Sequence, residues 1–153
     1  MKMLKKSLYS GVVAGLMVLA SSLWAASPPE NPATPPAGIN LVNADQVQAL
    51  QGQGAVLVDT RKAAEYAEGS LKGAISVVYD EKSAKDVQYD ASQDAFDMSK
   101  ISDKAQAYVV FCNGPTCWRS YKAAVMLAKN GYQKVNWYRD GFPDWKARNL
   151  PIE

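Results

Sequence analysis

The residues best suited to chemistry lie in one short run of the chain, residues 112–119, with the sequence CNGPTCWR. The run holds both cysteines of the chain, and six residues separate Cys112 from Arg119. Cysteine reacts as the thiolate, which a neighbouring guanidinium stabilises. The same positive charge attracts an anionic substrate. The run therefore indicates a thiol nucleophile that acts on an anion, with Cys112 and Arg119 as the catalytic residues.

The flanking sequence predicts the elements that position this run. Residues 108–111 are apolar and mostly β-favouring, so they indicate a buried strand that ends at Cys112. After Arg119 one apolar face repeats at helical spacing, formed by Tyr121, Ala124, Val125 and Ala128. Asn130-Gly131 should end this helix. In such a strand, loop and helix unit, the loop N–H groups and the first helical turn favour negative charge, so Cys112 should be held partly as thiolate.

The roles of the two cysteines stay open at this point. Cys112 is interpreted as the nucleophile, and the alternative is a buried half-cystine. Cys117 could resolve an oxidised Cys112 through a disulfide, line the pocket as a neutral thiol, or be the nucleophile itself. Trp118 either shields the pocket from water or covers the core. The interpretation of Arg119 as a site residue has a solvated helix start as its alternative.

The first residues of the chain predict export. Lys2, Lys5 and Lys6 precede an uncharged run that ends in small residues around Ala25. We expect a signal peptide over residues 1–25, a periplasmic location and no stable membrane insertion after processing; an uncleaved membrane anchor is the alternative. The proline-rich residues 26–38 should form an extended linker. The folded domain is expected over residues 39–153.

Composition excludes several classes of function. The chain has no histidine, so no mechanism can use imidazole as a base or a metal ligand, and no Cys/His cluster can hold zinc or haem. We expect no metal and no organic cofactor. The formal net charge of +2 becomes −1 without the three lysines of the predicted signal peptide. No basic patch is visible, so we expect no nucleic-acid partner.

The rest of the chain alternates strands with helices. We expect helices or helical turns over residues 44–50, around Glu65 and from Pro143, and strands over residues 55–58, 75–78 and 135–138. Residues 79–105 lack periodicity and should form a surface excursion, with short helical pieces around residues 91–98. This order predicts an α/β fold of three layers, with a central, mostly parallel sheet of about five strands flanked by helices.

Ligands bind beyond the carboxyl ends of the strands in such sheets. Polar residues follow three predicted strands at that edge: Asp59 with Arg61, the run 112–119, and residues 139–141. We therefore expect one site there. Asp59 is interpreted as a structural residue at this site and Arg61 as a substrate contact, and a structural ion pair between the two is the alternative. Trp137 and Trp145 are expected in the core.

Three segments resemble the single-domain rhodanese family of sulfurtransferases. They are VLVDTRKAAEYAEGSLKGAISV (residues 56–77), VVFCNGPTCWRS (residues 109–120) and GYQKVNWYRDGFPDWKARNLP (residues 131–151). The resemblance covers nearly all of residues 39–153 and implies a rhodanese-like domain. Ser70 stands where histidine is commoner in the family. The loop from Cys112 to Arg119 is longer than the usual family loop, and a longer loop is also typical of phosphatase and arsenate-reductase relatives of this fold.

The resemblance implies that Cys112 accepts a sulfane sulfur, forms a persulfide and delivers the sulfur to an acceptor. The expected donors are thiosulfate, polysulfide or a persulfide, and the expected acceptors are a thiol or cyanide. The loop would cradle the anion through its backbone N–H groups, except at Pro115, which has none. The expected substrate-binding residues are Asn113, Gly114, Thr116, Cys117, Trp118 and Arg61.

Two other classes of function remain as alternatives. One is a thiol-disulfide redox protein, in which Cys112 and Cys117 cycle between dithiol and disulfide. The other is a non-catalytic rhodanese-like module that binds sulfur species or a partner protein. A phosphatase-type activity is the weakest alternative. The sequence specifies no oligomeric state.

Overall fold

The structure is a computed structural model, and it describes residues 25–153. The predicted signal peptide lies outside the described residues except for its last residue, so export stays a prediction. In the described part of the chain, no helix has both the length and the apolar character needed to cross a membrane.

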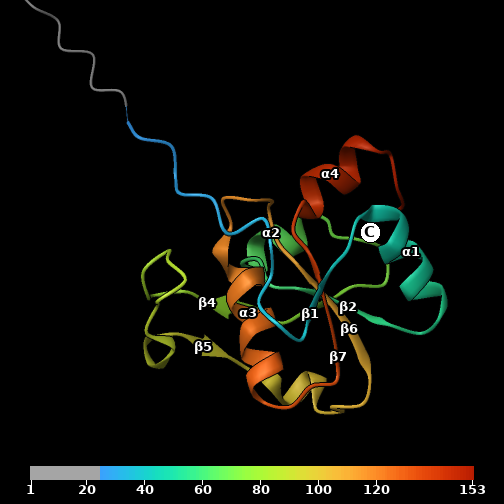
Figure 1. Cartoon of the computed structure of the whole chain (residues 1–153). Coiled ribbons are helices and arrows are strands. Elements are labelled where there is room, and N and C mark those ends of the chain that lie inside the picture. The colour runs from blue at the N-terminus through green and yellow to red at the C-terminus, as the bar shows by residue number, and fades with distance from the viewer. Residues whose placement is uncertain (1–24) are drawn as a thin grey trace, which may run out of the picture.

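A parallel five-stranded sheet forms the centre of the molecule (Figure 1). In spatial order its strands are β1 Ile39–Leu41, β7 Lys134–Tyr138, β6 Ala107–Phe111, β2 Val56–Asp59 and β3 Ile75–Ser76. Every neighbouring pair in this sheet runs parallel. The predicted fold class is therefore confirmed. The strand at β1 was not predicted, and β3 is shorter than expected because the chain leaves the sheet after Ser76.

Helices cover both faces of this sheet and complete the three layers (Figure 1). On one face lie α1 Ala44–Gly52 and α4 Gly141–Ala147, whose Val47 and Trp145 pack into the same apolar cluster. On the other face lies α3 Trp118–Lys129, the helix that follows the cysteine run. Asn43 caps α1. Its side chain accepts a hydrogen bond from Gln46 N, and its own backbone N–H donates a hydrogen bond to the Gln46 side chain.

Side chains alternate between the two faces of the sheet along each strand, so each face has its own apolar core. In β6, Val109 and Phe111 point to the α1 and α4 face, and Tyr108 and Val110 point to the α3 face. All four side chains are buried. A strand that is buried on both faces is fixed in position, so its last residue places Cys112 firmly.

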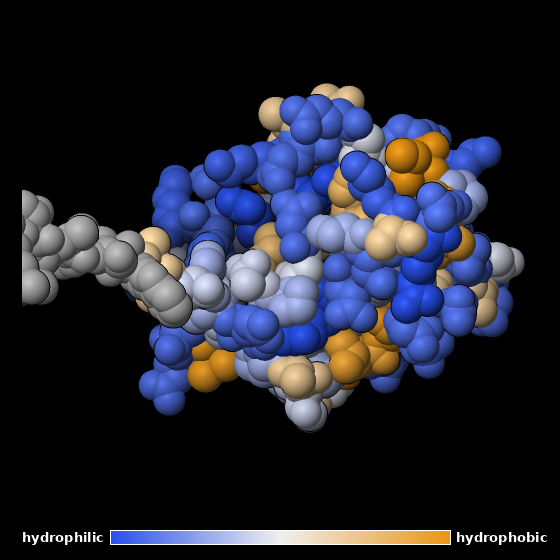
Figure 2. Space-filling view, turned by 90° about the horizontal axis from the view of Figure 1, so that it is seen from above, coloured by the Kyte–Doolittle hydropathy of each residue, from blue (hydrophilic) through white to orange (hydrophobic). Residues whose placement is uncertain are grey.

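The excursion between β3 and β6 has more structure than the sequence indicated. It contains an antiparallel pair, β4 Tyr79–Asp80 with β5 Ala95–Phe96, and two 3-10 helices, η1 Ala91–Gln93 and η2 Met98–Ile101. The excursion packs against α3. Seen from above, the surface is mostly hydrophilic, and apolar residues form separate patches (Figure 2).

Candidate active site

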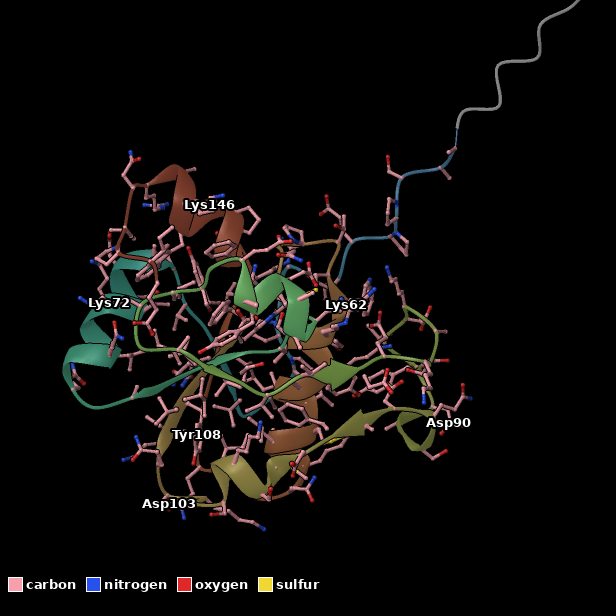
Figure 3. All side chains as sticks on the ribbon, turned by 180° about the vertical axis from the view of Figure 1, so that it is seen from behind. Lys62, Lys72, Asp90, Asp103, Tyr108 and Lys146 are labelled. Atoms are coloured by element: carbon pink, nitrogen blue, oxygen red, sulfur yellow. A yellow bond between two sulfur atoms is a disulfide. The ribbon has the colours of Figure 1, made fainter. Side chains whose placement is uncertain are left out.

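The register of the sheet brings three polar segments to one edge. Asp59 at the end of β2 pairs with Phe111 at the end of β6, which pairs with Tyr138 at the end of β7. The next residues of the three strands therefore start their loops at the same level. Figure 3 shows Tyr108 near the start of β6 and Lys62 beyond the opposite, carboxyl end of the sheet. The three segments expected at the site lie together at this edge.

The two cysteines of the run are joined by a disulfide between Cys112 and Cys117. Cys112 is fully buried, whereas Cys117 keeps 8% of its surface exposed. Cys117 is also the N-cap residue of α3, so the disulfide links the end of β6 to the start of α3. In this state both sulfur atoms are engaged with each other, and neither is available as a nucleophile.

A serine hydroxyl contacts the buried sulfur. Ser120 Oγ lies 3.1 Å from Cys112 Sγ and accepts a hydrogen bond of 3.0 Å from Trp137 Nε1. A disulfide sulfur carries no proton, so Ser120 is the donor in the contact with Cys112. All three side chains are buried. The indole N–H thus orients the hydroxyl, and the hydroxyl proton points at the sulfur.

The loop amides do not cradle this sulfur in the described structure. The expected cradle consists of the backbone N–H groups of residues 113–118 other than Pro115, but none of them donates a hydrogen bond to Cys112 Sγ. The N–H of Cys117 instead donates to Gly114 O at 3.0 Å, and the Cys117 carbonyl oxygen lies 3.2 Å from Cys112 Sγ. The disulfide accounts for this difference, because the bond directs the Cys112 sulfur toward Cys117.

The start of α4 holds the backbone of Cys112. Phe142 N donates a 2.9 Å hydrogen bond to Cys112 O. Gly141 has a φ of 63°, and a Cβ at this position would overlap the carbonyl group of Cys112. Only glycine therefore permits this close approach. Gly141 and Phe142 thus act on the loop through their backbone.

Arg119, the second residue of α3, carries the positive charge of the run. It is half-buried, and among the described residues it forms neither a hydrogen bond nor an ion pair. Glu65 lies nearby and accepts a 2.5 Å hydrogen bond from Asn113 Nδ2. Partial burial raises the pKa of Glu65, but the bonds from Asn113 and the Lys62 amide, together with the charge of Arg119, leave that pKa below its usual value.

Arg61 has a different environment from the one expected of a substrate contact. Its Nε and NH2 groups bind both carboxylate oxygens of Asp59, and NH2 also donates to Gly69 O at 2.7 Å. The guanidinium stacks on the Phe142 ring, 4.1 Å from its centroid. Ser70 Oγ adds a 2.7 Å hydrogen bond to Asp59. Arg61 is thus buried in an ion pair that braces the end of β2, and it is not placed to bind a substrate.

The predicted linker docks on the loop. Asn31, which is buried, donates from Nδ2 to Cys117 O at 2.9 Å and from N to Pro115 O at 2.8 Å. Trp118 Nε1 donates to Pro29 O at 2.9 Å. Residues 29–31, which we call the strap, have no helix or strand, as expected of a proline-rich segment. They are nevertheless part of the site rather than a free spacer.

Arg139 connects the strap to the edge of the sheet. Its Nε donates to Asn31 Oδ1 and its NH2 donates to Asn31 O, both at 2.8 Å. The same NH2 lies 3.2 Å from Glu30 Oε2. Trp118 is buried beneath the strap and packs edge-on against Tyr121. Thr116 is exposed at the surface of the loop.

Sequence reasoning missed two residues of this site. Ser120 lies in the quoted motif, and a polar residue at the start of the predicted helix was the available signal. Asn31 gave no signal, because its partners Cys117 and Arg139 are distant in the chain. Within residues 25–153, no group of three or more His, Cys, Asp or Glu residues could hold a metal ion.

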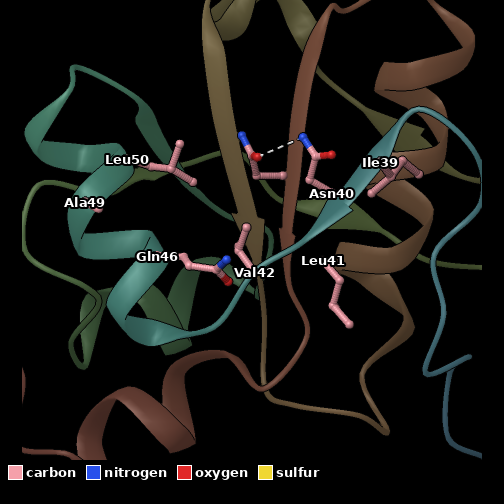
Figure 4. A pocket seen from close by; sticks show the side chains of 8 residues that line it. Ile39, Asn40, Leu41, Val42, Gln46, Ala49 and Leu50 are labelled. Atoms are coloured by element: carbon pink, nitrogen blue, oxygen red, sulfur yellow. Dashed lines mark hydrogen bonds between the residues drawn. The ribbon is translucent and has the colours of Figure 1, made fainter.

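A hollow of about 580 Å³ lies away from the cysteines, between β1 and α1 (Figure 4). It is lined by residues such as Leu41, Gln46 and Leu50, and Asn40 bonds Asn136 across it at 3.3 Å. No residue of the run 112–119 lines this hollow. The hollow is therefore separate from the loop that holds the cysteines.

Comparison with models of protein families identifies the family to which this fold belongs. A model of the rhodanese-like domain matches residues 43–148, which is more than half of the chain. The chain belongs to the rhodanese-like domain family. The matched range includes Cys112, Arg119 and every strand of the central sheet except β1. A comparison with curated proteins gave no match.

Solved structures share this rhodanese-like fold. A protein from Bacillus halodurans is 22% identical, with a TM-score of 0.57, and the match covers 74% of this chain and 76% of that one. A protein from Lactobacillus plantarum is 24% identical, with a TM-score of 0.54 and coverage of 74% and 87%. A thiosulfate sulfurtransferase from Pseudomonas aeruginosa is 24% identical, with a TM-score of 0.55, and this chain spans 20% of its length.

Proposed function

We propose that this chain is an exported sulfurtransferase that carries a sulfane sulfur on Cys112. The observation that carries the proposal is the position of Cys112 Sγ, between a buried strand and the start of α3, with the Ser120 hydroxyl directed at it. A hydrogen-bond donor and a helix N-terminus both stabilise negative charge on sulfur. The free guanidinium of Arg119 supplies a positive charge for the anionic donor.

The reaction takes two displacements. The Cys112 thiolate attacks the outer sulfur of thiosulfate, the S–S bond of thiosulfate breaks, and sulfite leaves with the electron pair. Cys112 then carries a persulfide. A thiolate or cyanide attacks the outer sulfur of this persulfide, and Cys112 leaves again as thiolate. No metal or organic cofactor takes part in either step.

The disulfide adds one requirement to this scheme. Cys112 must be reduced before it can accept sulfur, since its sulfur is bonded to Cys117. The proposed activity is therefore expected only after treatment with a reductant. This condition separates the protein from a carrier with a permanently free thiol.

The test uses protein that has been reduced and then freed of reductant. Thiosulfate is added, sulfite release is measured, and intact mass is recorded for the wild type and for Cys112→Ser. We expect sulfite release by the wild type and none by Cys112→Ser, whose hydroxyl is a far weaker nucleophile. If the reduced wild type releases no sulfite and gains no sulfur from thiosulfate or polysulfide, the proposal is wrong. A non-catalytic binding module would then be favoured.

The disulfide also favours a second candidate, a thiol-disulfide redox protein without sulfur transfer. Such a protein would exchange disulfides with other thiols through Cys117, the more exposed sulfur. It would reduce or oxidise a model disulfide substrate and would gain no sulfur from thiosulfate. The sulfite measurement above distinguishes the two candidates, since only the sulfurtransferase releases sulfite from thiosulfate.

A further inference from the structure

We propose that Cys117 completes the reaction within the molecule by displacing the transferred sulfur from Cys112 as sulfide. The resulting Cys112–Cys117 disulfide is then reduced by an external dithiol. This inference rests on the proposed sulfurtransfer, since it requires a persulfide on Cys112. It makes the protein a reductase that releases sulfane sulfur as sulfide, with a dithiol reductant as its second substrate.

The backbone holds the two cysteines where their sulfurs can meet. Their Cα atoms are 6.2 Å apart, within the usual range for a disulfide. Cys112 is fixed by the bond from Phe142 N to its carbonyl oxygen. Cys117 is fixed as the N-cap of α3 and by the bond from Asn31 to its carbonyl oxygen. Because both backbones are held from outside the loop, the Cys117 thiolate needs no large movement to reach Cys112 Sγ.

The steps balance with the two thiols of the chain. After sulfite has left, Cys112 carries a persulfide. The Cys117 thiolate attacks Cys112 Sγ, the S–S bond of the persulfide breaks, and the outer sulfur leaves with its electron pair and is protonated to hydrosulfide. The two cysteines are oxidised to a disulfide and the sulfane sulfur is reduced by two electrons. The chain has no third cysteine, so the electrons for the next cycle come from another molecule.

The site favours attack of this external reductant on Cys117. Cys117 keeps 8% of its surface exposed, whereas Cys112 is fully buried. Attack at Cys117 Sγ expels Cys112 as thiolate, and the Ser120 hydroxyl stabilises this leaving group. The intermediate is a mixed disulfide between Cys117 and the reductant. A dithiol resolves this mixed disulfide with its second thiol and restores both cysteines as thiols. With a monothiol, a second reductant molecule must bind before the mixed disulfide is resolved.

The test is a single turnover without free thiol. Reduced, desalted protein receives one equivalent of thiosulfate under anaerobic conditions, and sulfite, sulfide and intact mass are followed. We expect the wild type to release sulfite and then an equal amount of sulfide, and to end with the mass of the disulfide form. Cys117→Ser should release sulfite but retain one added sulfur on Cys112, with sulfide release reduced at least about tenfold. Cys112→Ser should release neither product.

Each outcome separates the two proposals. If the wild type releases sulfite but keeps its added sulfur and releases no sulfide, the role of Cys117 is overturned while the sulfurtransferase stands. If Cys117→Ser releases sulfide as fast as the wild type, the role is also overturned. If no sulfite appears, the proposed function itself fails.

A second experiment tests the reductant in steady state. Dithiothreitol should support sulfide release at least about tenfold faster than glutathione at equal thiol concentration, because its second thiol resolves the mixed disulfide. Equal rates would argue against a dithiol partner.

Discussion

The behaviour of Cys112 is set by a few buried contacts to its sulfur and its carbonyl group. The sulfur contacts the Ser120 hydroxyl, which Trp137 orients, and the sulfur of Cys117. A buried hydrogen bond from a fixed donor is worth more to a charged sulfur than to a neutral one. Ser120 is therefore a positioning residue that acts on the reacting sulfur.

Replacement of Ser120 tests this contact. We expect Ser120→Ala to lower the rate of sulfite release about ten- to a hundredfold, because a hydrogen bond to a charged group contributes about 1.5–3 kcal/mol. Alkylation of the reduced Cys112 by iodoacetamide should slow as well, while the midpoint of thermal unfolding changes little. Trp137→Phe is the comparison variant: it removes the N–H that orients Ser120, together with part of the buried ring, and leaves the Ser120 hydroxyl in place, so its effect on sulfite release should be smaller. A normal alkylation rate in a folded Ser120→Ala protein would contradict the assignment.

Glu65 should make the stability of the folded protein depend on pH. Its pKa in the folded protein is lowered from 4.5, so the folded state binds fewer protons than the unfolded state just below that pH. The stabilisation is complete above about pH 4.5 and is lost as the pH falls through the lowered pKa. We expect Glu65→Gln to destabilise the protein by less than about 1 kcal/mol at neutral pH, because the group is partly exposed. The difference between the two proteins in free energy of unfolding should vanish in acid; a difference that grows in acid would contradict this sign.

At the level of elements, the loop is held from three sides. The start of α4 binds its first carbonyl group, α3 begins at its last residue, and the strap bonds its middle and its end. The predicted cleavage site around Ala25 precedes the strap, so the mature protein would retain it. The strap thus limits how far the loop can open around the disulfide.

Removal of the strap contact should loosen the loop. Asn31→Ala removes the side-chain partner of Arg139 Nε and of the Cys117 carbonyl oxygen, and we expect it to destabilise the protein by about 1–3 kcal/mol. The Cys112–Cys117 disulfide should be reduced faster by dithiothreitol, which a thiol-trapping assay measures. Asn40→Ala is the matched control, because Asn40 is exposed on β1 and does not contact the loop. Equal reduction rates in the two variants would argue against the strap.

The close approach of α4 to Cys112 leads to a prediction about Gly141. Gly141→Ala should destabilise the protein by more than about 2 kcal/mol and lower sulfite release, because its methyl group displaces the Cys112 carbonyl. Gly131→Ala is the control, since Gly131 also has a positive φ but no atoms near its missing Cβ. That change should cost about 1 kcal/mol and leave the activity intact. Urea unfolding and the sulfite assay measure both effects, and equal losses in the two variants would show that the overlap is unimportant.

At the scale of the whole molecule, one buried lysine joins the excursion to the helix of the active site. Lys122 in α3 is fully buried; its Nζ lies 3.0 Å from Glu81 Oε2, 3.8 Å from Asp94 Oδ2 and 2.8 Å from Ser83 Oγ. Hydrogen bonds from Ser83, from the Lys82 amide and from Tyr79 lower the pKa of Asp94 despite its burial, which raises it. The excursion therefore depends on a charge that α3 supplies.

Loss of this lysine should weaken the whole fold. Lys122→Met leaves two nearly buried carboxylates without their cation, and we expect a destabilisation of about 3–5 kcal/mol in chemical unfolding. Lys129→Met, on an exposed turn of the same helix, should change the stability by less than about 0.5 kcal/mol. If the two variants were equally stable, the cluster would not anchor the excursion.

The sequence alone predicted the local elements around the loop. The strand before Cys112, the helix after it and the parallel sheet all follow from apolar periodicity, which depends on near neighbours in the chain. The absence of histidine likewise excluded imidazole as a base or a metal ligand without any structure. The resemblance to the rhodanese family pointed to Cys112 as the sulfur carrier, and the match over residues 43–148 confirms the family.

Only the tertiary structure decided which groups meet. It engages Arg61 with Asp59, brings Asn31 to the Cys117 carbonyl and directs Ser120 at the Cys112 sulfur. The Arg61–Asp59 pair is local and was one of two alternatives, but the other contacts join residues from different segments, and the bond between Asn31 and Cys117 spans 86 positions of the chain. Periodicity and motif spacing describe one segment at a time, whereas the pairing of a buried polar group depends on which segments pack around it. For that reason the loop could be predicted from the sequence, but its partners could not.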